Sequence, residues 1–291
     1  MTLRIRGLTH TYPNGTRALD NITIDISPGM FGLLGPNGAG KSSLMRTIAT
    51  LQAPSAGSIE FSGIDVLKRP EALRRTLGYL PQDFGVYPRV TAESMLDHLA
   101  VLKGITNARE RREVVHGLLN KVNLWEVRKK AIAGFSGGMR QRFGIAQALI
   151  GDPQLIIVDE PTAGLDPEER NRFLNLLAAI GYGVVVILST HIVEDVAQLC
   201  RSMAILSGGR VVHQGAPDAL RRELHGRVWS ATIAQDALEV TRNRYTVISE
   251  RLLGGKTVVH VLASDPPGAE FTSVEGSLED VYFSTLASTR S

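Results

Sequence analysis

Hydrophobic and polar residues alternate over the first part of the chain. Ile22, Ile24 and Ile26 are separated by polar residues, and residues 13–15 (Pro-Asn-Gly) form a turn signal. Alternation of this kind is typical of half-buried antiparallel strands. The segment 30–34 is apolar throughout apart from one glycine. We therefore predict antiparallel strands over about the first 27 residues, followed by a short buried strand.

A helical period replaces the alternation in two later segments. The first begins after residue 40, where apolar residues recur at helical spacing (Leu44, Met45, Ile48 and Leu51). The second runs from about residue 83 to residue 150 and is predicted to be an all-helical insertion. A further β stretch is expected between them, at about residues 57–61.

Short apolar runs return in the second half of the chain. Residues 155–158, 184–188 and 203–206 have the composition of buried strands, and a helical pattern at 171–180 separates the first two. Strand–helix–strand order of this kind implies parallel pairing. A Ser-Gly-Gly-Arg turn at 207–210 then predicts a hairpin.

The pattern changes once more after about residue 226. Strands are predicted at 227–234, 245–252 and 256–263, and a short helix at 277–287. Ser277 and Asp280, three residues apart at the start of that helix, form a variant of the capping box. We therefore expect an α/β domain over residues 1–225 and a small α+β region over residues 226–291.

Composition narrows the class of protein. Of the 291 residues, 43% are hydrophobic and 21% are charged, as in ordinary globular domains. The longest apolar runs are too short to cross a bilayer, and the N-terminus does not resemble a signal peptide. The single cysteine, Cys200, excludes an internal disulfide, fits a reducing cytosol and is expected to be buried. A net charge of +3, without a dense basic run, gives little support for nucleic-acid binding.

The most informative segment lies between the buried strand and the first predicted helix. Residues 35–42 match the pattern G-x-x-x-x-G-K-[ST], in which glycine N–H groups at a helix N-terminus surround a phosphate chain. A simple glycine-rich helix cap is the alternative, but every fixed position of the pattern is present. Lys41 is expected to reach the outer phosphates, and the Ser42 hydroxyl to bind Mg²⁺. The predicted nucleotide-binding residues here are Gly35, Pro36, Asn37, Gly38, Ala39, Gly40, Lys41, Ser42 and Ser43.

Two acidic residues follow the apolar run at 155–158. Asp159 is expected at the carboxyl end of a parallel strand, where open α/β sheets bind ligands. We expect Asp159 to complete the Mg²⁺ shell and Glu160 to act as the base for an attacking water. Paired acids can also cap a following helix, and Pro161 fits that alternative. The upstream phosphate-binding pattern favours the catalytic interpretation.

A second glycine-rich segment, Ser136-Gly137-Gly138, precedes another predicted helix. Ser136 could be no more than a helix cap. A hydroxyl, glycine N–H groups and a helix dipole also make an anion site. One nucleotide cannot use both glycine-rich sites of a single chain unless the insertion folds back. Two chains facing head to tail could each contribute one.

Six short motifs occur in a fixed order along the chain. They are residues 35–42, Gln82 within Leu80-Pro81-Gln82, Ser136-Gly137-Gly138, Asp159-Glu160, Ala163-Gly164-Leu165-Asp166 and Ser189-Thr190-His191. Together they resemble the ATP-binding subunit of an ABC transporter, and the resemblance covers about residues 2–225. Phe135 and Met139 replace the leucine and glutamine that usually flank Ser-Gly-Gly in this family, but the central motif is intact.

The resemblance implies a role for each matched residue. Ser136, Gly137 and Gly138 would meet the γ-phosphate bound by the opposite subunit. Gln82 would contact Mg²⁺ and water, and Asp166 would cross the subunit interface. His191 would sense the γ-phosphate. Tyr12 would stack on adenine, although it could also be an ordinary surface tyrosine beside a turn.

The resemblance also implies a fold and an activity. The fold would be α/β, a P-loop NTPase core of ABC-ATPase type with an antiparallel β subdomain, a helical insertion and a small C-terminal α+β appendix. The chain would bind MgATP, dimerise with a second copy or a related subunit, and drive an integral-membrane permease. Its place would be cytoplasmic, on the inner face of the membrane. Met139 and the segment 277–282 are similar to the export-type branch, whose permeases are separate polypeptides.

Several alternatives differ in what the sequence should contain. A soluble ABC-type ATPase acting on DNA would have long heptads between Lys41 and Ser136, and none are present. Relatives that act on ribosomes usually carry two cassettes, and this chain carries one. A kinase or GTPase gives no reason for Ser136-Gly137-Gly138 or His191. A cassette that binds ATP without cleaving it would lack some of Lys41, Asp159, Glu160 and His191.

Overall fold

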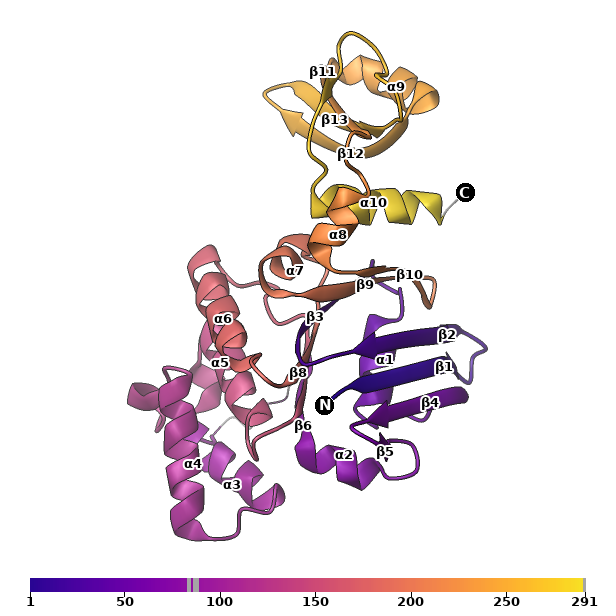
Figure 1. Cartoon of the computed structure of the whole chain (residues 1–291). Helices are drawn as coiled ribbons and strands as arrows, with labels where there is room; N and C mark the ends of the chain where they lie inside the picture. Colours follow the sequence, from indigo (N-terminus) through magenta and orange to yellow (C-terminus); the bar gives the residue numbers. More distant parts are fainter. Residues whose placement is uncertain (83–84, 86–88, 290–291) are drawn as a thin grey trace.

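The computed structural model describes residues 1–82, 85 and 89–289, and its described strands form three sheets (Figure 1). The predicted start of the helical insertion at about residue 83 and the last two residues lie outside the described residues. The first sheet is antiparallel and confirms the N-terminal prediction. Its order is β2 (Arg17–Ile26), β1 (Leu3–Thr11), β4 (Ala56–Phe61) and β5 (Ile64–Asp65).

The second sheet forms the centre of the molecule. Its order is β10 (Arg210–Gly215), β9 (Ser202–Ser207), β3 (Gly29–Leu34), β8 (Val185–Ser189), β7 (Leu155–Asp159) and β6 (Leu77–Leu80). All neighbours are parallel except the β9–β10 hairpin, which confirms the predicted pairing. Every residue of β7 and β8 is buried, because helices cover one face of the sheet, and α1 (Lys41–Ile48) and the first sheet cover the other.

Helices surround the central sheet. They are α1 (Lys41–Ile48), α2 (Pro70–Thr76), α5 (Gly137–Ala148), α6 (Pro167–Ile180), α7 (Val193–Leu199) and α8 (Pro217–Arg222). The insertion adds α3 (Ala92–Leu102), α4 (Ala108–Lys121) and two 3₁₀ turns, Trp125–Val127 and Ile132–Gly134.

Two sequence predictions about these helices were wrong in detail. Leu51 lies beyond the end of α1 and is 56% exposed, so it does not continue the apolar face of that helix. The helix predicted to begin at residue 171 begins at Pro167, because Asp166 caps its first turn and proline fits the first helical position.

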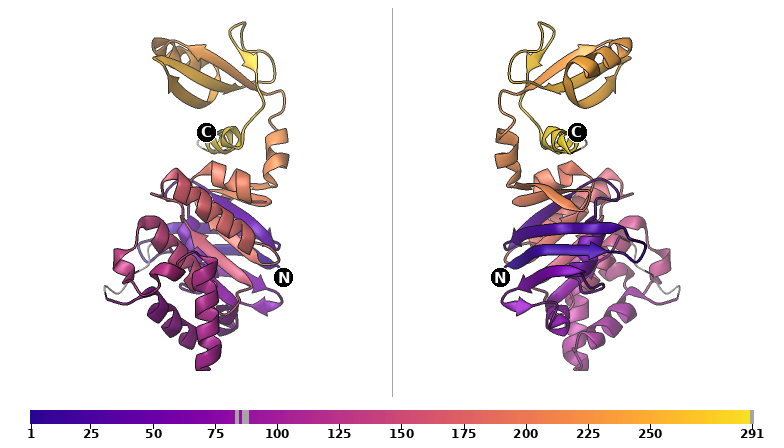
Figure 2. Two further views of the ribbon diagram at one scale, coloured as in Figure 1. Left: turned by 90° about the vertical axis from the view of Figure 1, so that its left-hand side faces the viewer. Right: turned by 90° about the vertical axis from the view of Figure 1, so that its right-hand side faces the viewer.

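The third sheet is antiparallel and lies at the C-terminal end of the molecule (Figure 2). Its order is β12 (Thr246–Leu253), β13 (Lys256–Leu262), β11 (Val228–Ile233) and β14 (Thr272–Ser273). The helices of this region are α9 (Leu238–Arg244), preceded by a 3₁₀ turn at Gln235–Ala237, and α10 (Leu278–Ser288). The predicted Ser277/Asp280 capping box is present.

Helix α10 lies between this third sheet and helices α7 and α8 (Figure 1). Its inward side chains, Leu278, Val281, Tyr282 and Leu286, are buried. They belong to the same apolar cluster as side chains of α7 and the central sheet. The last helix of the chain therefore covers apolar surface that is formed by residues before 226.

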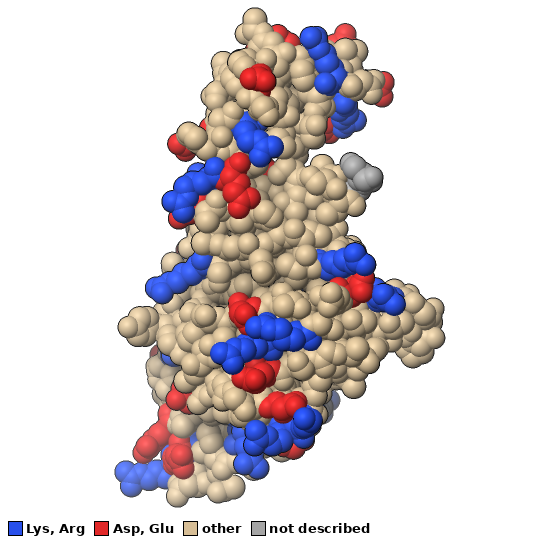
Figure 3. Space-filling view, turned by 45° about the vertical axis from the view of Figure 1, so that its right-hand side comes forward, with Lys and Arg blue, Asp and Glu red and all other residues tan. Residues whose placement is uncertain are grey.

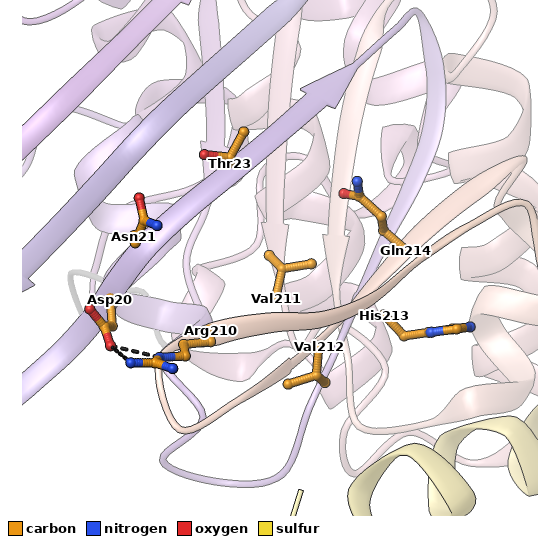
Figure 4. Close-up of a pocket in the computed structure, with 8 residues that line it drawn as sticks. All are labelled: Asp20, Asn21, Thr23, Arg210, Val211, Val212, His213 and Gln214. Carbon is orange, nitrogen blue, oxygen red and sulfur yellow. Dashed lines mark hydrogen bonds and ion pairs between the residues drawn. The ribbon is translucent and has the colours of Figure 1, made fainter. Parts of the chain in front are cut away.

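The first sheet is joined to the central sheet beside a shallow pocket of about 670 Å³ (Figure 4). Asp20 at one side of the pocket accepts hydrogen bonds from Arg210 of β10, with its Oδ2 at 2.7 Å from Nε. The Arg210 guanidinium lowers the pKa of Asp20 below its usual value. This ion pair joins β2 to the hairpin that contains the turn 208–209, and residues of both segments line a cavity beside residues 36–43.

The environment of Cys200 agrees with the sequence prediction. Cys200 is buried as expected, and burial raises the pKa of its thiol to about 12, so it is not a reactive thiolate. Within the described part of the chain, no helix combines the length and apolar character needed to span a bilayer.

Candidate functional site

The loop between β3 and α1 has the geometry of a phosphate-binding loop. Gly40 has φ of 104°, and a Cβ at this position would lie 2.4 Å from the carbonyl oxygen of Ala18. Only glycine fits a site with both constraints. The helix that follows has no side-chain cap and no acidic residue in its first turn. No side chain caps its N-terminal N–H groups, which leaves them available to an anion.

Lys41, the first residue of α1, is buried at the base of this loop. Its Nζ donates to the carbonyl oxygens of Gly35 at 2.6 Å and Pro36 at 3.3 Å, and lies 3.6 Å from Oε1 of Glu160. The Lys41 and Glu160 side chains are 7% and 9% exposed. Solvent screens such a pair weakly, so loss of either partner leaves the other buried without its opposite charge.

Glu160 follows β7 in a strained backbone conformation. Its φ of 49° is unusual for a residue with a side chain, and its N–H donates to the carbonyl oxygen of Ser189 at 2.9 Å. The Nδ1–H of His191 donates to Oε2 of Glu160 at 2.6 Å. The ends of β7 and β8 thus bring together the predicted base and the predicted phosphate sensor.

Asp159 is the last residue of β7 and is 4% exposed. Burial raises the pKa of its carboxyl group, and the hydroxyls of Ser189 and Ser42 oppose this shift. Its Oδ1 is buried and has no hydrogen-bond partner among the described residues. An unpaired buried carboxylate oxygen beside the Ser42 hydroxyl suits a hard cation such as Mg²⁺.

A cavity of about 510 Å³ lies between the phosphate loop, Glu160 and His191, whereas Asp159 and Gly35 are not among its lining residues. Of the predicted residues, it is lined by Tyr12, Pro36, Asn37, Gly38, Ala39, Gly40, Lys41, Ser42, Ser43, Gln82, Glu160 and His191. The Tyr12 hydroxyl lies 3.0 Å from Oγ of Ser43, which holds the aromatic ring beside the loop. The cavity is of a size that small-molecule sites typically have.

Some lining residues were missed by the sequence analysis. They come from the start of β2 and the residue before it, and from the β9–β10 turn, namely Thr16, Arg17, Ala18, Gly208 and Gly209. Ala163 also contributes; it belongs to a motif named above but was not assigned to the site. The residues of β2 reach the cavity through the packing of the first sheet on the central sheet, which no local motif indicates.

The second glycine-rich segment does not line this cavity. Ser136 is exposed at the start of α5, where its Oγ accepts a hydrogen bond from the N–H of Met139 at 3.2 Å. Asp166 is exposed at the start of α6, where its Oδ1 accepts a hydrogen bond from the N–H of Glu169 at 2.9 Å. Gly138 is buried against the Glu169 carboxylate, where a Cβ would have no room. Ser136, Gly137, Gly138 and Asp166 therefore stand apart from the phosphate loop of their own chain.

Comparison with known proteins places this site in a family. A family model described as "ABC transporter" matches residues 19–163. The daunorubicin/doxorubicin resistance ATP-binding protein DrrA of Streptomyces peucetius is 33% identical over 267 residues, which cover 90% of this chain and 78% of that protein. The chain belongs to the ABC transporter ATP-binding proteins.

Other relatives of this ABC protein carry related names. The Nod factor export ATP-binding protein I of Rhizobium etli is 38% identical over 207 residues, covering 70% of this chain and 65% of that protein. The probable multidrug ABC transporter ATP-binding protein YbhF of Escherichia coli is 32% identical over 257 residues. The match covers 85% of this chain and 43% of YbhF, so YbhF is much longer.

Solved structures agree with this assignment. A structure described as the ATP-binding subunit of an ABC transporter has a TM-score of 0.68 and 31% identity, covering 77% of this chain and 94% of that one. A dimeric post-hydrolysis state of the cassette MJ0796, bound to ADP and Pi, has a TM-score of 0.67 and 26% identity, covering 74% and 98%. The chain has the ABC-type P-loop NTPase fold, binds ATP and is an ATPase.

Proposed function

We propose that this ATPase powers export through a separate membrane permease, and that two subunits close head to tail around two MgATP. One observation carries the proposal. Lys41, Glu160 and His191 meet in one cavity, whereas Ser136 and Asp166 are exposed outside it. A second subunit can supply the missing anion site. The dimeric cassette MJ0796 supports this arrangement, and the drug-resistance and Nod-factor-export relatives support the direction of transport.

Hydrolysis in this site requires a positioned water and a stabilised γ-phosphate. The α1 N–H groups and the Lys41 ammonium bind the phosphate chain. Glu160 accepts a proton as water forms a bond to the γ-phosphorus, and the bond to the β–γ bridging oxygen breaks to release ADP and phosphate. The hydrogen bond from His191 to Glu160 supports a role for His191 in orienting that carboxylate, and the imidazole lines the same cavity.

Ser42, Gln82 and Asp159 are the residues we assign to Mg²⁺. A hydroxyl, an amide oxygen and a carboxylate are ligands that this hard cation accepts, and the unpaired Oδ1 of Asp159 supplies an available oxygen. When bound, the cation would neutralise negative charge on the phosphates. Tyr12, which lines the same cavity, is the proposed adenine platform.

The partner is proposed to be an integral-membrane permease, which holds the ATPase at the inner face of the membrane. Action on nucleic acid is the weaker alternative. On the face shown in Figure 3, Lys/Arg and Asp/Glu side chains are interspersed. The net charge of +3 is also small, whereas nucleic-acid binders gather basic residues on one surface.

Replacement of Glu160 by Gln tests the proposed catalytic role. The variant keeps the shape of the side chain but removes its basicity, so turnover should fall by about 10²–10⁴-fold while ATP still binds. Glu71→Gln, in an exposed ion pair on α2, is the matched control and should hydrolyse ATP at the parental rate. A Glu160→Gln variant as fast as the parent would overturn the assignment.

A further inference from the structure

A buried acidic residue outside the nucleotide cavity connects three parts of the site. Asp195, in the first turn of α7, is 0% exposed. A carboxylate in such a position is unfavourable unless several hydrogen bonds or an opposite charge compensate it. Both of its oxygens are in fact paired, and the partners come from two other segments of the chain.

The first partner belongs to the turn that follows Glu160. The hydroxyl of Thr162 donates to Oδ2 of Asp195 at 2.6 Å, and Thr162 is itself 2% exposed. Thr162 lies within a compact turn, because the N–H of Ala163 donates to the carbonyl oxygen of Glu160 and that of Leu165 to the carbonyl oxygen of Thr162. Fixing Thr162 therefore fixes the backbone on both sides, from Glu160 to Asp166.

The second partner belongs to α6. The Nε of Arg170 donates to Oδ1 of Asp195 at 2.8 Å, and its Nη2 lies 2.6 Å from the same oxygen. The N–H of Arg170 also donates to the carbonyl oxygen of Asp166, one helical turn earlier. His191 lies two residues before the start of α7, and Asp195 lies four residues after His191. The position of α7 therefore influences the position of the imidazole.

We propose that Asp195 is a positioning residue for ATP hydrolysis. It holds the turn 160–166 and α6 against α7, so that His191 stays within hydrogen-bond distance of Glu160 and Asp166 is presented toward the second subunit. It touches neither the nucleotide cavity nor the reacting atoms. The inference rests on the proposed catalytic roles of Glu160 and His191.

This arrangement predicts an effect on rate rather than on ATP affinity. The phosphate loop and Lys41 belong to β3 and α1, which make no hydrogen bond to Asp195 within the described structure. Asp195→Asn should lower kcat by about 10- to 100-fold, because displacements of about 1 Å in a catalytic group have costs of this size. KM and the Kd of a fluorescent ATP analogue should stay within about twofold of the parent.

A matched control separates positioning from loss of stability. Asp280 is also a buried aspartate, 1% exposed, and its hydrogen-bond partners His260, Ser277 and Ser249 all lie in the C-terminal region. Asp280→Asn should lower Tm while kcat stays parental. Thr162→Val should reduce kcat in the same direction as Asp195→Asn, and Thr162→Ser, which keeps the hydroxyl, should recover most of that loss.

The experiment measures kcat, KM, analogue binding and Tm for these four full-length variants and for Glu160→Gln. The inference is overturned if Asp195→Asn or Thr162→Val binds the analogue and turns over as fast as Asp280→Asn. If Asp195→Asn does not fold, the Thr162→Val and Thr162→Ser pair decides alone. A parental rate for Glu160→Gln would instead refute the proposed catalytic site, whereas an inactive Glu160→Gln beside a fast Asp195→Asn would refute only the positioning role.

Discussion

The effect of removing residues 226–291 on stability follows from the packing of helix α10. Every catalytic motif lies before residue 226, so the sequence predicts a core that folds without the rest, with coverage of apolar core surface by the last helix as the alternative. In the structure Leu278, Val281, Tyr282 and Leu286 of α10 are 3–9% exposed and share an apolar cluster with α7. This packing favours the alternative.

The contribution of α10 to the free energy of unfolding follows from the burial of these four side chains. Burial of a large apolar side chain contributes about 1.5–3 kcal/mol, so the contacts of α10 contribute on the order of 6–12 kcal/mol as an upper estimate. A whole domain is typically stable by only about 5–15 kcal/mol. A chain ending at His225 should therefore aggregate or melt far below the full chain, because it exposes a contiguous apolar patch.

A second variant separates the helix from the third sheet. The N–H of Val274 donates to the carbonyl oxygen of Val228 at 3.0 Å, so a short Gly/Ser linker can join these positions and keep α10. This variant should stay soluble and hydrolyse ATP. The assay is thermal melting, size-exclusion chromatography and ATPase turnover of all three chains. If the chain ending at His225 is soluble, binds ATP and melts like the full chain, the packing of α10 does not stabilise the rest of the protein.

Three further predictions concern the nucleotide site. Lys41→Ala should abolish tight ATP binding, because it removes the ammonium from the phosphates and leaves Glu160 buried without its partner; unchanged affinity in an equilibrium binding assay would contradict this. Ser136→Arg should block hydrolysis, yet mixing it with Lys41→Ala should recover some turnover, because a mixed dimer has one intact site; absence of recovery would argue against independent sites completed in trans. Burial raises the pKa of Asp159 above 3.8, so its ionisation lowers apo-protein stability as pH rises above that value. Asp159→Asn should therefore raise Tm at pH 7 but not below about pH 4, and an equal gain at both pH values would contradict the linkage.

The sequence predicted strands β3, β7, β8 and β9 and the phosphate loop, because their signals are local. The run at 155–158 ends in Asp159-Glu160, and residues 35–42 carry both the loop and its helix start. A glycine-rich turn also identified the hairpin at 207–210, where Gly208 and Gly209 both have positive φ.

Other features depend on contacts that no local pattern encodes. Helices α2, α7, α8 and α9 have six or seven residues, too few turns to show a helical period. Asp195 and Thr162 are 33 positions apart, and no local pattern in the sequence indicates that their side chains meet. The apolar face of α10 is visible in the sequence, but the surface that it covers is determined by the chain's path through the third sheet.

The proposed arrangement, in which a second subunit completes each ATP site, can be tested by the mass of Glu160→Gln in the presence of MgATP. Because this variant should bind ATP without cleaving it, the closed dimer should accumulate. Size-exclusion chromatography with light scattering should then give twice the 31.5 kDa of the chain with MgATP, and 31.5 kDa without it. Addition of Ser136→Arg to Glu160→Gln should restore the monomer. A Glu160→Gln chain that binds ATP and remains a monomer at every concentration tested would show that a second subunit does not complete the ATP site.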